Sequence, residues 1–544
     1  NRQWELHQFR SRYHRDEVTN NRGGWAKLEF SKTEHLTSEG YFTYLKEFKG
    51  GHSLNAVAGY SYFEKNGENF NAENYDFGVE GLKYWDLGAG SYLTDGKAAM
   101  GSGKNITERL FALYARANYS YNDKYMVSAT IRHEGSSKFA AENRWGNFWA
   151  LSGGWRVSAE EFMKEFDWVK VRFGYGVTGN NDFDASYMAN TLSRDQYWML
   201  PSGSWAYVYG PSSNVNPYLG WEEKKEWNIG VDYSFFGNRM YGKFDYYRRK
   251  IDGMIYEVNV PQPPYPNGKQ WQNIGEMESK GWEFEVGGDI IQNKDFTWTS
   301  SLNMSHNSGK ILTMYGNNSR MDGNAMDEPG WPGDAARIEE GAEIGAFHMW
   351  KFAGFDDKGD FLLYNKDGEV IPASQKSVDD KQYIGNYLPK VMMGWNNTFT
   401  YKNFDLGINM RSWIGFDVLN TYPMYLGIQG QSGAGQWNLW KPALDDPKFK
   451  DIRGVKQLCD YFLEDGSFLK IDAITLGYTL ALNKYTKWAE RLRVYGTVGN
   501  VATITGYSGH NPEVDITGWT GGTDKVWNCD PIVRTYTLGI QVTF

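Results

Sequence analysis

The last ten residues of the chain, TYTLGIQVTF, alternate strictly between apolar and polar side chains. Successive side chains of a β-strand point to opposite faces. One face of this strand therefore carries Tyr536, Leu538, Ile540, Val542 and Phe544, and the other carries threonine, glycine and glutamine. Such a strand fits a sheet with one face against lipid and the other against water. We expect the last strand of an antiparallel sheet to end at Phe544.

The same alternation recurs upstream in pairs of segments joined by short polar turns. Four examples are FALYARANYSY–NDK–YMVSATIRH, EWNIGVDYSF–FGNR–MYGKFDYYRR, WEFEVGGDII–QNKD–FTWTSSLNMS and VMMGWNNTFT–YKN–FDLGINMRSW. Each pair predicts a β-hairpin. Two further connections, 158–168 and 483–492, predict short turns that each contain about one helical turn.

The connections between these hairpins are long and rich in Gly, Asn, Asp, Trp and Tyr. Short turns at one end and long loops at the other are typical of outer-membrane β-barrels, with the turns in the periplasm and the loops outside the cell. The final strand then runs from a long loop down to the periplasm. The predicted long loops are 66–109, 179–225, 251–280, 306–389, 414–467 and 500–533.

Composition favours the same architecture. Aromatic residues make up 17% of the chain, yet the mean hydropathy is −0.62 and no stretch approaches the roughly 18 apolar residues of a membrane-spanning helix. Only helices and closed barrels satisfy every backbone polar group in hydrocarbon, and a barrel confines its apolar residues to alternate positions. A soluble propeller or solenoid would show a regular repeat. We predict an all-β transmembrane antiparallel β-barrel of roughly sixteen strands over residues 1–544.

Charge and cysteine content exclude other classes. The net charge is −9, and no basic cluster predicts nucleic-acid binding. The only two cysteines, Cys459 and Cys529, lie in predicted extracellular loops, where a disulfide between them is an open alternative. The chain begins in polar sequence, NRQWELHQFR, without a signal peptide. We therefore expect the N-terminus of the whole protein to lie upstream.

Seven segments carry a family resemblance and occur in the family's order. They are RHEGSSKFAAENRWGNFWALSGGWRVSAEEFM (132–163), VKVRFGYGVTGN (169–180), NPYLGWEEKKEWNIGVDYSFFGNR (216–239), NIGEMESKGWEFEV (273–286), YIGNYLPKVMMGW (383–395), FLKIDAITLGYTL (468–480) and TGYSGHNPEV (505–514). Together they resemble the SusC-like (SusC/RagA) TonB-dependent transporters of Bacteroidetes over roughly residues 110–544. The terminal aromatic residue also resembles the signature by which outer-membrane barrels are recognised for insertion.

The resemblance implies a fold larger than this chain. Family members have a 22-stranded barrel, an N-terminal plug inside it and a TonB-binding segment before the plug. The plug and that segment are not in this chain, so we expect residues 1–544 to be the C-terminal portion of the barrel, embedded in the bacterial outer membrane.

The resemblance also implies a function, which is active import of oligosaccharides. Its implied partners are a SusD-like surface lipoprotein that acts as a lid and the TonB–ExbB–ExbD system that supplies energy, with the barrel–lid pairs associating as dimers. An importer of peptides and a passive porin-type barrel are the alternatives.

An enzyme is not expected. Ser305 and His306 are adjacent, so on a strand they would point to opposite faces and could not form a nucleophile–base pair. The chain contains no GxSxG or HExxH motif. The segment 356–370, DDKGDFLLYNKDGEV, keeps only fragments of a calcium loop, so we predict a turn there and no metal or cofactor.

Aromatic residues in the predicted loops are the candidate ligand-binding residues, because an aromatic face can cover the apolar side of a sugar ring. Each could instead pack loop against loop, join the interfacial aromatic girdle, or contact the lid. Arg116, Arg132, Arg172 and Asp232 are predicted to line a polar lumen. The candidate substrate-binding residues are Trp198, Trp205, Tyr207, Tyr209, Trp271, Trp331, Trp437 and Trp519, with Trp350, Trp440 and Trp527 as further loop tryptophans.

Overall fold

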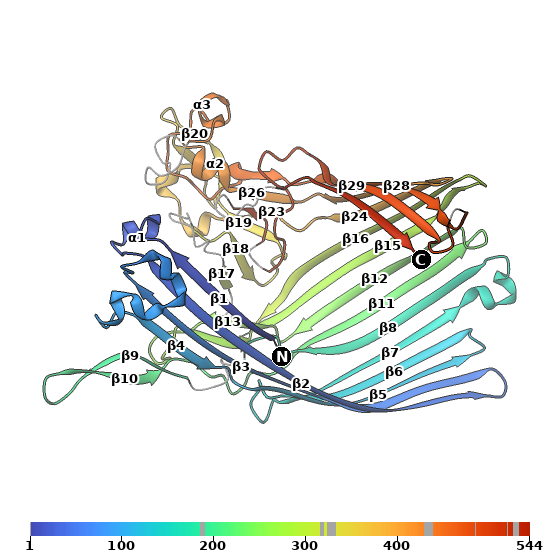
Figure 1. The fold of residues 1–544 in the computed structure, drawn as a ribbon, viewed down its shortest axis with the longest axis horizontal. Helices are drawn as coiled ribbons and strands as arrows, with labels where there is room; N and C mark the ends of the chain where they lie inside the picture. Colours follow the sequence, from blue (N-terminus) through green and yellow to red (C-terminus); the bar gives the residue numbers. More distant parts are fainter. Residues whose placement is uncertain are drawn as a thin grey trace.

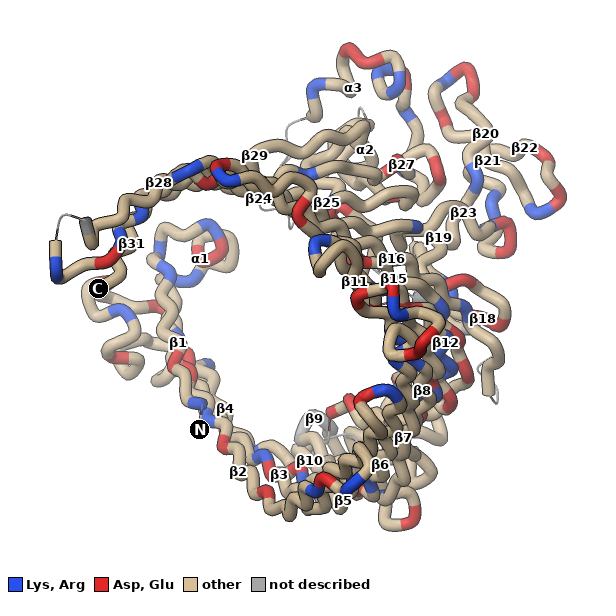
Figure 2. The backbone as a smooth tube through the Cα atoms, turned by 90° about the vertical axis from the view of Figure 1, so that its right-hand side faces the viewer, with Lys and Arg blue, Asp and Glu red and all other residues tan. Residues whose placement is uncertain are grey.

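The chain forms one large antiparallel sheet that curves around an open interior, with most of the loops gathered at one end (Figure 1, Figure 2). The computed structural model describes residues 2–184, 191–315, 320–323, 333–428, 439–484, 486–518, 521–525 and 532–544. Figure 1 views the wall from the side, and Figure 2 looks along its interior.

The large sheet contains 17 strands. β4 and β5 both pair with β3, along successive stretches of it, so the two occupy one position in the wall. The number of strand positions thus confirms the predicted sixteen or so. The strands are β1 (Arg2–Arg10), β2 (Trp25–Phe48), β3 (His52–Tyr75), β4 (Ala99–Lys104), β5 (Glu108–Tyr121), β6 (Tyr125–Ser136), β7 (Trp145–Arg156), β8 (Trp168–Asn180), β11 (Glu222–Phe235), β12 (Met240–Asp252), β15 (Gly275–Gln292), β16 (Phe296–Met314), β24 (Val391–Tyr401), β25 (Phe404–Ile414), β28 (Phe468–Ala481), β29 (Arg491–Thr505) and β31 (Thr535–Thr543).

Neighbours in the wall follow chain order and are antiparallel throughout. β1 pairs with β2, and β31 pairs with β29. Among the residues that the structure describes, these two strands have no other partner, so they form the two edges of the wall.

The remaining elements lie in the connections. The described helices include none that is long and apolar enough to cross a membrane. The small sheets are β9 (Leu192–Met199) with β10 (Trp205–Pro211), β13 (Ile255–Asn259) with β14 (Lys269–Asn273), β17 (Arg320–Gly323) with β18 (Ala336–Glu339), β19 (Ala346–Met349) with β23 (Gln382–Asn386), β20 (Lys351–Phe355) with β21 (Phe361–Tyr364) and β22 (Val370–Pro372), and β26 (Asp417–Asn420) with β27 (Leu463–Asp465) and β30 (Thr523–Asp524). The α-helices are α1 (Arg15–Thr19), α2 (Thr421–Leu426) and α3 (Pro442–Asp445), and the 3-10 helices are η1 (Glu80–Trp85), η2 (Leu87–Ala89), η3 (Ser91–Leu93), η4 (Val157–Ala159), η5 (Glu161–Met163), η7 (Ala373–Gln375), η8 (Val378–Asp380), η10 (Asp460–Phe462) and η11 (Leu482–Lys484).

The outer face of the wall is apolar because the register aligns the alternation of neighbouring strands. In β31 the side chains of Leu538 and Ile540 are 90% and 72% exposed, and Ile540 pairs with Val494 of β29. Among the residues that the structure describes, little covers these side chains, and lipid is the solvent that suits them. The opposite face carries the polar residues of each strand, as predicted for a water-filled interior.

Aromatic residues gather in two rows at the ends of this apolar face. One row lies by the short turns, where the rings of Tyr121 and Tyr125 stack 6.4 Å apart and Trp488 lies 5.8 Å from Phe544. Phe544 therefore lies at the turn end of the wall, as the sequence predicted. We call the other row the upper aromatic row; it includes Trp227, Tyr246, Trp282 and His306, with Trp227–Tyr246 at 5.5 Å and Trp282–His306 at 6.3 Å. Aromatic belts of this kind mark the two membrane–water interfaces.

The turn end matches the predicted periplasmic side. The connection from β7 to β8 contains η4 and η5, and the connection from β28 to β29 contains η11, so the helical turns predicted in 158–168 and 483–492 are confirmed. Four of the tight turns join the hairpins that the sequence predicted.

Several strands continue beyond their predicted ends. β2 and β3 are 24 residues long and remain paired from Phe48↔His52 to Trp25↔Tyr75. The loop predicted to begin at residue 66 therefore begins only after Tyr75. Residues 64–74, EKNGENFNAEN, carry polar side chains on both faces, with Phe70 and Ala72 as exceptions. Their apolar alternation is therefore weak, although their backbones still form the ladder.

The long loops also build a core of their own, which the sequence did not predict. We call it the loop core; it includes Phe347, Met349, Leu363, Leu419 and Phe462, each no more than 2% exposed. Figure 2 shows the elements around it, including β20 to β22, outside the ring of strands. Cys459 is buried in the same core, and burial raises the pKa of its thiol to about 12. Cys529 lies outside the described residues, so a Cys459–Cys529 disulfide stays a prediction.

The outer face gives a direct test of the membrane orientation. Replacing Leu538 by arginine, Leu538→Arg, puts a charge into hydrocarbon and should destabilise the barrel by about 2–4 kcal/mol. Thr537→Arg is the matched control, because Thr537 faces the interior and should change stability little. Urea unfolding of the protein in lipid vesicles measures both. Equal losses of stability for the two variants would contradict the assignment of the faces.

Candidate functional site

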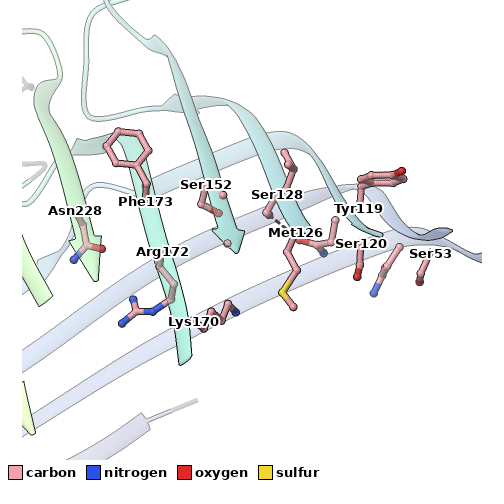
Figure 3. A pocket seen from close by; sticks show the side chains of 16 residues that line it. Ser53, Tyr119, Ser120, Met126, Ser128, Ser152, Lys170, Arg172, Phe173 and Asn228 are labelled. Carbon is pink, nitrogen blue, oxygen red and sulfur yellow. Dashed lines mark hydrogen bonds between the residues drawn. The ribbon is translucent and has the colours of Figure 1, made fainter. Parts of the chain in front are cut away.

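The interior face of the wall is hollowed near the short turns (Figure 3). The depression has a volume of about 490 Å³ and lies across β3, β5 to β8 and β11. Small residues, including Ser152, Gly154 and Gly174, leave the space open. Figure 3 shows Lys170 and Arg172 pointing to one side of the sheet and Phe173 to the other. The depression is therefore a polar part of the lumen.

Arg172 is the centre of an ion-pair network in this part of the lumen. Its Nε and one Nη donate to the carboxylate oxygens of Asp232 at 2.8 and 2.9 Å, and it also donates to Asp245 at 3.0 Å. Asn228 donates to Asp245 as well, at 3.2 Å. A methyl group at Gly230 would lie 2.3 Å from an Asp245 oxygen, so the network fits only because that residue is glycine.

The other predicted luminal arginines have similar surroundings. Arg132 donates to Glu134 at 2.8 Å and to Ser61 at 3.2 Å. Arg116 donates to Asn118 at 3.3 Å. These hydrogen bonds hold neighbouring polar side chains in place on the water-exposed face of the wall, as expected for luminal residues. Each guanidinium is a permanent cation with no acid–base role.

The adjacent pair Ser305 and His306 is separated by the pleat of β16. Ser305 lies opposite Glu283 and His306 opposite Trp282, on the other face. The His306 Nδ1 lies 2.6 Å from the backbone oxygen of Lys390. The two side chains therefore cannot work together, as the sequence predicted.

The four aromatic residues predicted in one loop lie together on the β9–β10 hairpin, at the loop end of the molecule (Figure 1). Trp198 and Trp205 are each 66% exposed, Tyr207 is 54% exposed and Tyr209 is 67% exposed. Trp205 pairs with Met199 and Tyr207 with Tyr197, so these four share one face of the hairpin. Trp198 pairs with Ala206 and faces the opposite way.

Tyr197 and Met199 were not singled out from the sequence, although they complete this exposed face. The Tyr197 hydroxyl donates to the Tyr207 hydroxyl at 2.7 Å, and the two rings lie 4.5 Å apart. The alternation of 197, 199, 205 and 207 within the loop was the signal that could have identified them. We call Tyr197, Met199, Trp205 and Tyr207 the hairpin face.

The other candidate tryptophans do not join the hairpin face. Trp271 is half-buried against a small loop cluster that includes Phe139 and Phe183, with its ring 6.0 Å from Phe183. Trp350 is buried in the loop core, where its indole donates to the Ser377 carbonyl at 2.8 Å, and Trp440 packs against the same core. Trp331, Trp437, Trp519 and Trp527 lie outside the described residues.

The segment that shares acidic positions with a calcium loop forms two turns of the β20–β21–β22 sheet. The Asp356 carboxylate accepts from the backbone N–H of Lys358 and of Asp360, each at 2.9 Å. Asn365 accepts in the same way from Glu369 at 2.8 Å. The predicted turn is therefore confirmed. Over the described ranges, no group of three or more His, Cys, Asp and Glu side chains is placed to hold a metal ion.

An antiparallel wall with an apolar outer face, a polar interior, short turns at one end and long loops at the other defines an outer-membrane β-barrel. The family model described as "TonB dependent receptor-like, beta-barrel" matches residues 1–501. The chain therefore belongs to the TonB-dependent receptor family, within which it is SusC-like, and it is an outer-membrane protein.

Curated relatives agree with this assignment. The TonB-dependent receptor SusC of Bacteroides thetaiotaomicron is 30% identical over 80% of this chain and 44% of its own length. The TonB-dependent receptor P3 of Formosa agariphila is 29% identical over 96% of this chain and 53% of its own length. The chain spans about half the length of the curated relatives that it matches.

Among solved structures, the RagAB peptide transporter matches with a TM-score of 0.79 at 24% identity. The match covers 96% of this chain and 56% of the other. It shows that the two share the barrel fold. The TonB-dependent receptor family is a non-enzymatic kind of protein.

The Arg172 network should contribute to the stability of the wall. The variant Arg172→Ala removes the guanidinium that pairs with both Asp232 and Asp245, and should destabilise the protein by about 2 kcal/mol. Adding Asp245→Asn removes one of the two repelling charges and should restore part of that loss. Thermal unfolding of the two variants measures this. A double variant less stable than Arg172→Ala would contradict the proposed repulsion.

Proposed function

We propose that this chain is the barrel portion of an active importer that carries oligosaccharides across the outer membrane. The exposed aromatic residues at the loop end, above all Trp205 and Tyr207 of the hairpin face, carry the proposal. A sugar ring has an apolar side that packs on an aromatic ring, while its hydroxyl groups need acceptors and donors around it. The hairpin face supplies the aromatic rings, and the polar lumen supplies a water-filled route across the membrane for the bound sugar.

A lid and an energy source complete the proposed mechanism. We propose that a SusD-like surface lipoprotein closes over the loop end and that TonB, with ExbB and ExbD, supplies the energy through a plug. The barrel–lid pairs are proposed to associate as dimers. SusC among the relatives and the fold shared with the RagAB transporter support the lid and the coupling to TonB.

Some of the candidate residues fit ligand binding better than others. Trp198, Trp205, Tyr207 and Tyr209 are exposed at the loop end and are proposed to contact ligand. Trp271 is packed against Phe183, so a role in holding the loop fits it better. The roles of Trp331, Trp437 and Trp519 in ligand binding stay predictions from the sequence.

Uptake by whole cells tests the proposed activity. Cells that carry the full-length protein should take up a purified fluorescent oligosaccharide, and uptake should stop when TonB is deleted. Uptake that continues without TonB would show a passive porin-type barrel. Uptake of fluorescent peptides, with oligosaccharide left outside, would show a peptide importer. Either result would overturn the proposal.

The hairpin face predicts the effect of a single substitution. Trp205→Ala removes an exposed indole and should weaken oligosaccharide binding about 10-fold, because a central aromatic contact contributes about 1–2 kcal/mol. Isothermal titration of the purified full-length protein measures the change. Phe162→Ala is the control, since Phe162 is 71% exposed but lies on a periplasmic turn. Equal affinity for Trp205→Ala and the unchanged protein would exclude the hairpin face from the binding site.

A further inference from the structure

The connection that follows β29 turns back into the barrel before it joins the other loops. Glu513, in the first part of this connection, contacts two basic side chains of the wall. The Glu513 carboxylate accepts hydrogen bonds from Arg411 of β25 at 3.0 Å and from Lys470 of β28 at 3.1 Å. Arg411 and Lys470 lie opposite each other in the register of the two strands. We call residues 507–514 the inner strap.

The alternation of the strands places this contact inside the barrel. Leu469 is 38% exposed on the apolar outer face, so its neighbour Lys470 points to the lumen. The side chain of Lys470 is nevertheless only 6% exposed, because Glu513 and the inner strap lie over it. The sequence predicts the strap in an extracellular loop, whereas the structure packs it against the interior of the wall.

The outer face of the same strands shows the depth of this contact. Beyond Lys470 toward the loops, the outward side chains remain apolar, with Ile414 45% exposed and Ile504 60% exposed. Ile504 pairs with Leu469, one residue beyond Lys470. Lipid therefore surrounds the wall at least as far out as Lys470. Glu513 thus reaches down into the membrane-spanning part of the barrel.

Apolar contacts hold the inner strap at both ends. Tyr507 and Val514 belong to one cluster with Trp413 and Phe468, which lie two residues beyond the basic pair on the same face of the wall. Tyr507 and Phe468 are buried. The Tyr507 hydroxyl also donates to Asp524 at 2.7 Å. These contacts, together with the ion pair, fix the strap against the wall.

The ion pair with Glu513 connects the strap to the wall and is not needed within the wall itself. Arg411 also donates to Asp472 of β28 at 3.1 Å, so it keeps a carboxylate partner from its own sheet. Among the residues that the structure describes, Lys470 forms its ion pair with Glu513 alone. What Glu513 adds is therefore a charged link between a loop and the buried Lys470.

A segment packed on the inner face narrows the lumen. Layers of backbone that pack face to face lie about 10 Å apart. The inner strap therefore removes about that depth from the cross-section of the lumen beside β25 and β28. A molecule that enters from the loop end has to pass the strap before it reaches the wall beneath.

We propose that the inner strap is a fixed constriction that limits the size of the molecules entering the lumen from outside, and that Glu513 is the residue that positions it. Its contacts with Arg411 and Lys470 keep the strap folded inward. This inference rests on the barrel architecture and is independent of which ligand the barrel carries.

Labelling of a cysteine placed beneath the strap tests the proposal. Asn409→Cys puts it on the same face as Arg411, two residues nearer the turns, at an exposed position. Purified full-length protein that also carries Cys459→Ala/Cys529→Ala is treated with a small maleimide and with a bulky polyethylene-glycol maleimide. The bulky reagent should react much more slowly than the small one.

Releasing the strap should remove this difference. Glu513→Gln keeps the size of the side chain and removes its charge. The bulky reagent should then label Asn409→Cys about 10-fold faster, because the strap loses charge-assisted hydrogen bonds to the wall. The rate with the small reagent should change little.

Two matched controls separate the strap from the rest of the lumen. Ala150→Cys places the cysteine on the luminal face of β7, away from the strap, and its labelling should be the same with and without Glu513→Gln. Asp405→Asn breaks a luminal ion pair with Arg493, at 3.1 Å, that does not include the strap. It should leave the labelling of Asn409→Cys unchanged.

Three results would overturn the proposal. Equal rates of the two reagents at Asn409→Cys with Glu513 in place would show that nothing constricts the lumen there. An unchanged rate of the bulky reagent in Glu513→Gln would show that Glu513 does not position the strap. Faster labelling at Ala150→Cys as well would show a general loosening of the barrel.

A second variant keeps the test decisive if Glu513→Gln does not fold because Lys470 is left buried without a counter-charge. Glu513→Gln/Lys470→Met removes both charges and should give the same acceleration at Asn409→Cys. The electrophoretic mobility of the unheated protein checks that each variant has folded. A folded double variant with unaccelerated labelling would contradict the proposal.

Discussion

The hydrogen bonds between neighbouring backbones are the interaction on which the rest of this structure depends. In hydrocarbon no water can replace a missing bond, so each strand needs a partner on both sides wherever lipid surrounds it. A continuous antiparallel ladder from β2 to β29 meets that demand. The strict alternation of the side chains then follows from the pleat, which assigns one set to lipid and the other to the lumen.

That assignment explains where polarity is concentrated. Charged groups such as Arg172 and Asp245 are confined to the interior, where they compensate each other at 3.0 Å. Close packing within the network depends on Gly230, which a larger residue could not replace without displacing Asp245. Beyond the upper aromatic row, charged side chains are no longer confined to the interior face and occur on the outer face as well.

Local patterns made much of the wall predictable. The segment that ends at Phe544, the tight hairpins and the helical turn near Glu161 each depend on residues that are close in sequence. The resemblance to SusC-like proteins, carried by segments such as 132–163, anticipated the family. Luminal residues such as Arg172 followed from the same alternation, and the four hairpin aromatics were correctly predicted to share one loop.

Features that depend on distant residues were not predictable. The loop core brings Phe347, Leu419 and Phe462 together from three parts of the chain, and no local period marks them. The outer half of β3 has polar residues on both faces, so only its pairing with β2 reveals it as a strand. Trp271 was indistinguishable in sequence from Trp205, because exposure and not residue type separates them.

The length of the β2–β3 hairpin has a mechanical consequence. Twenty-four residues at about 3.3 Å each, tilted by about 40°, rise about 60 Å, against an apolar band of about 25 Å. More than half of the hairpin thus lies outside the apolar band and is built from the same ladder as the part inside it. A protein bound to the protruding end of this hairpin would be held at a fixed height and angle relative to the membrane. The reason is that the protruding end and the membrane-embedded part belong to one continuous sheet.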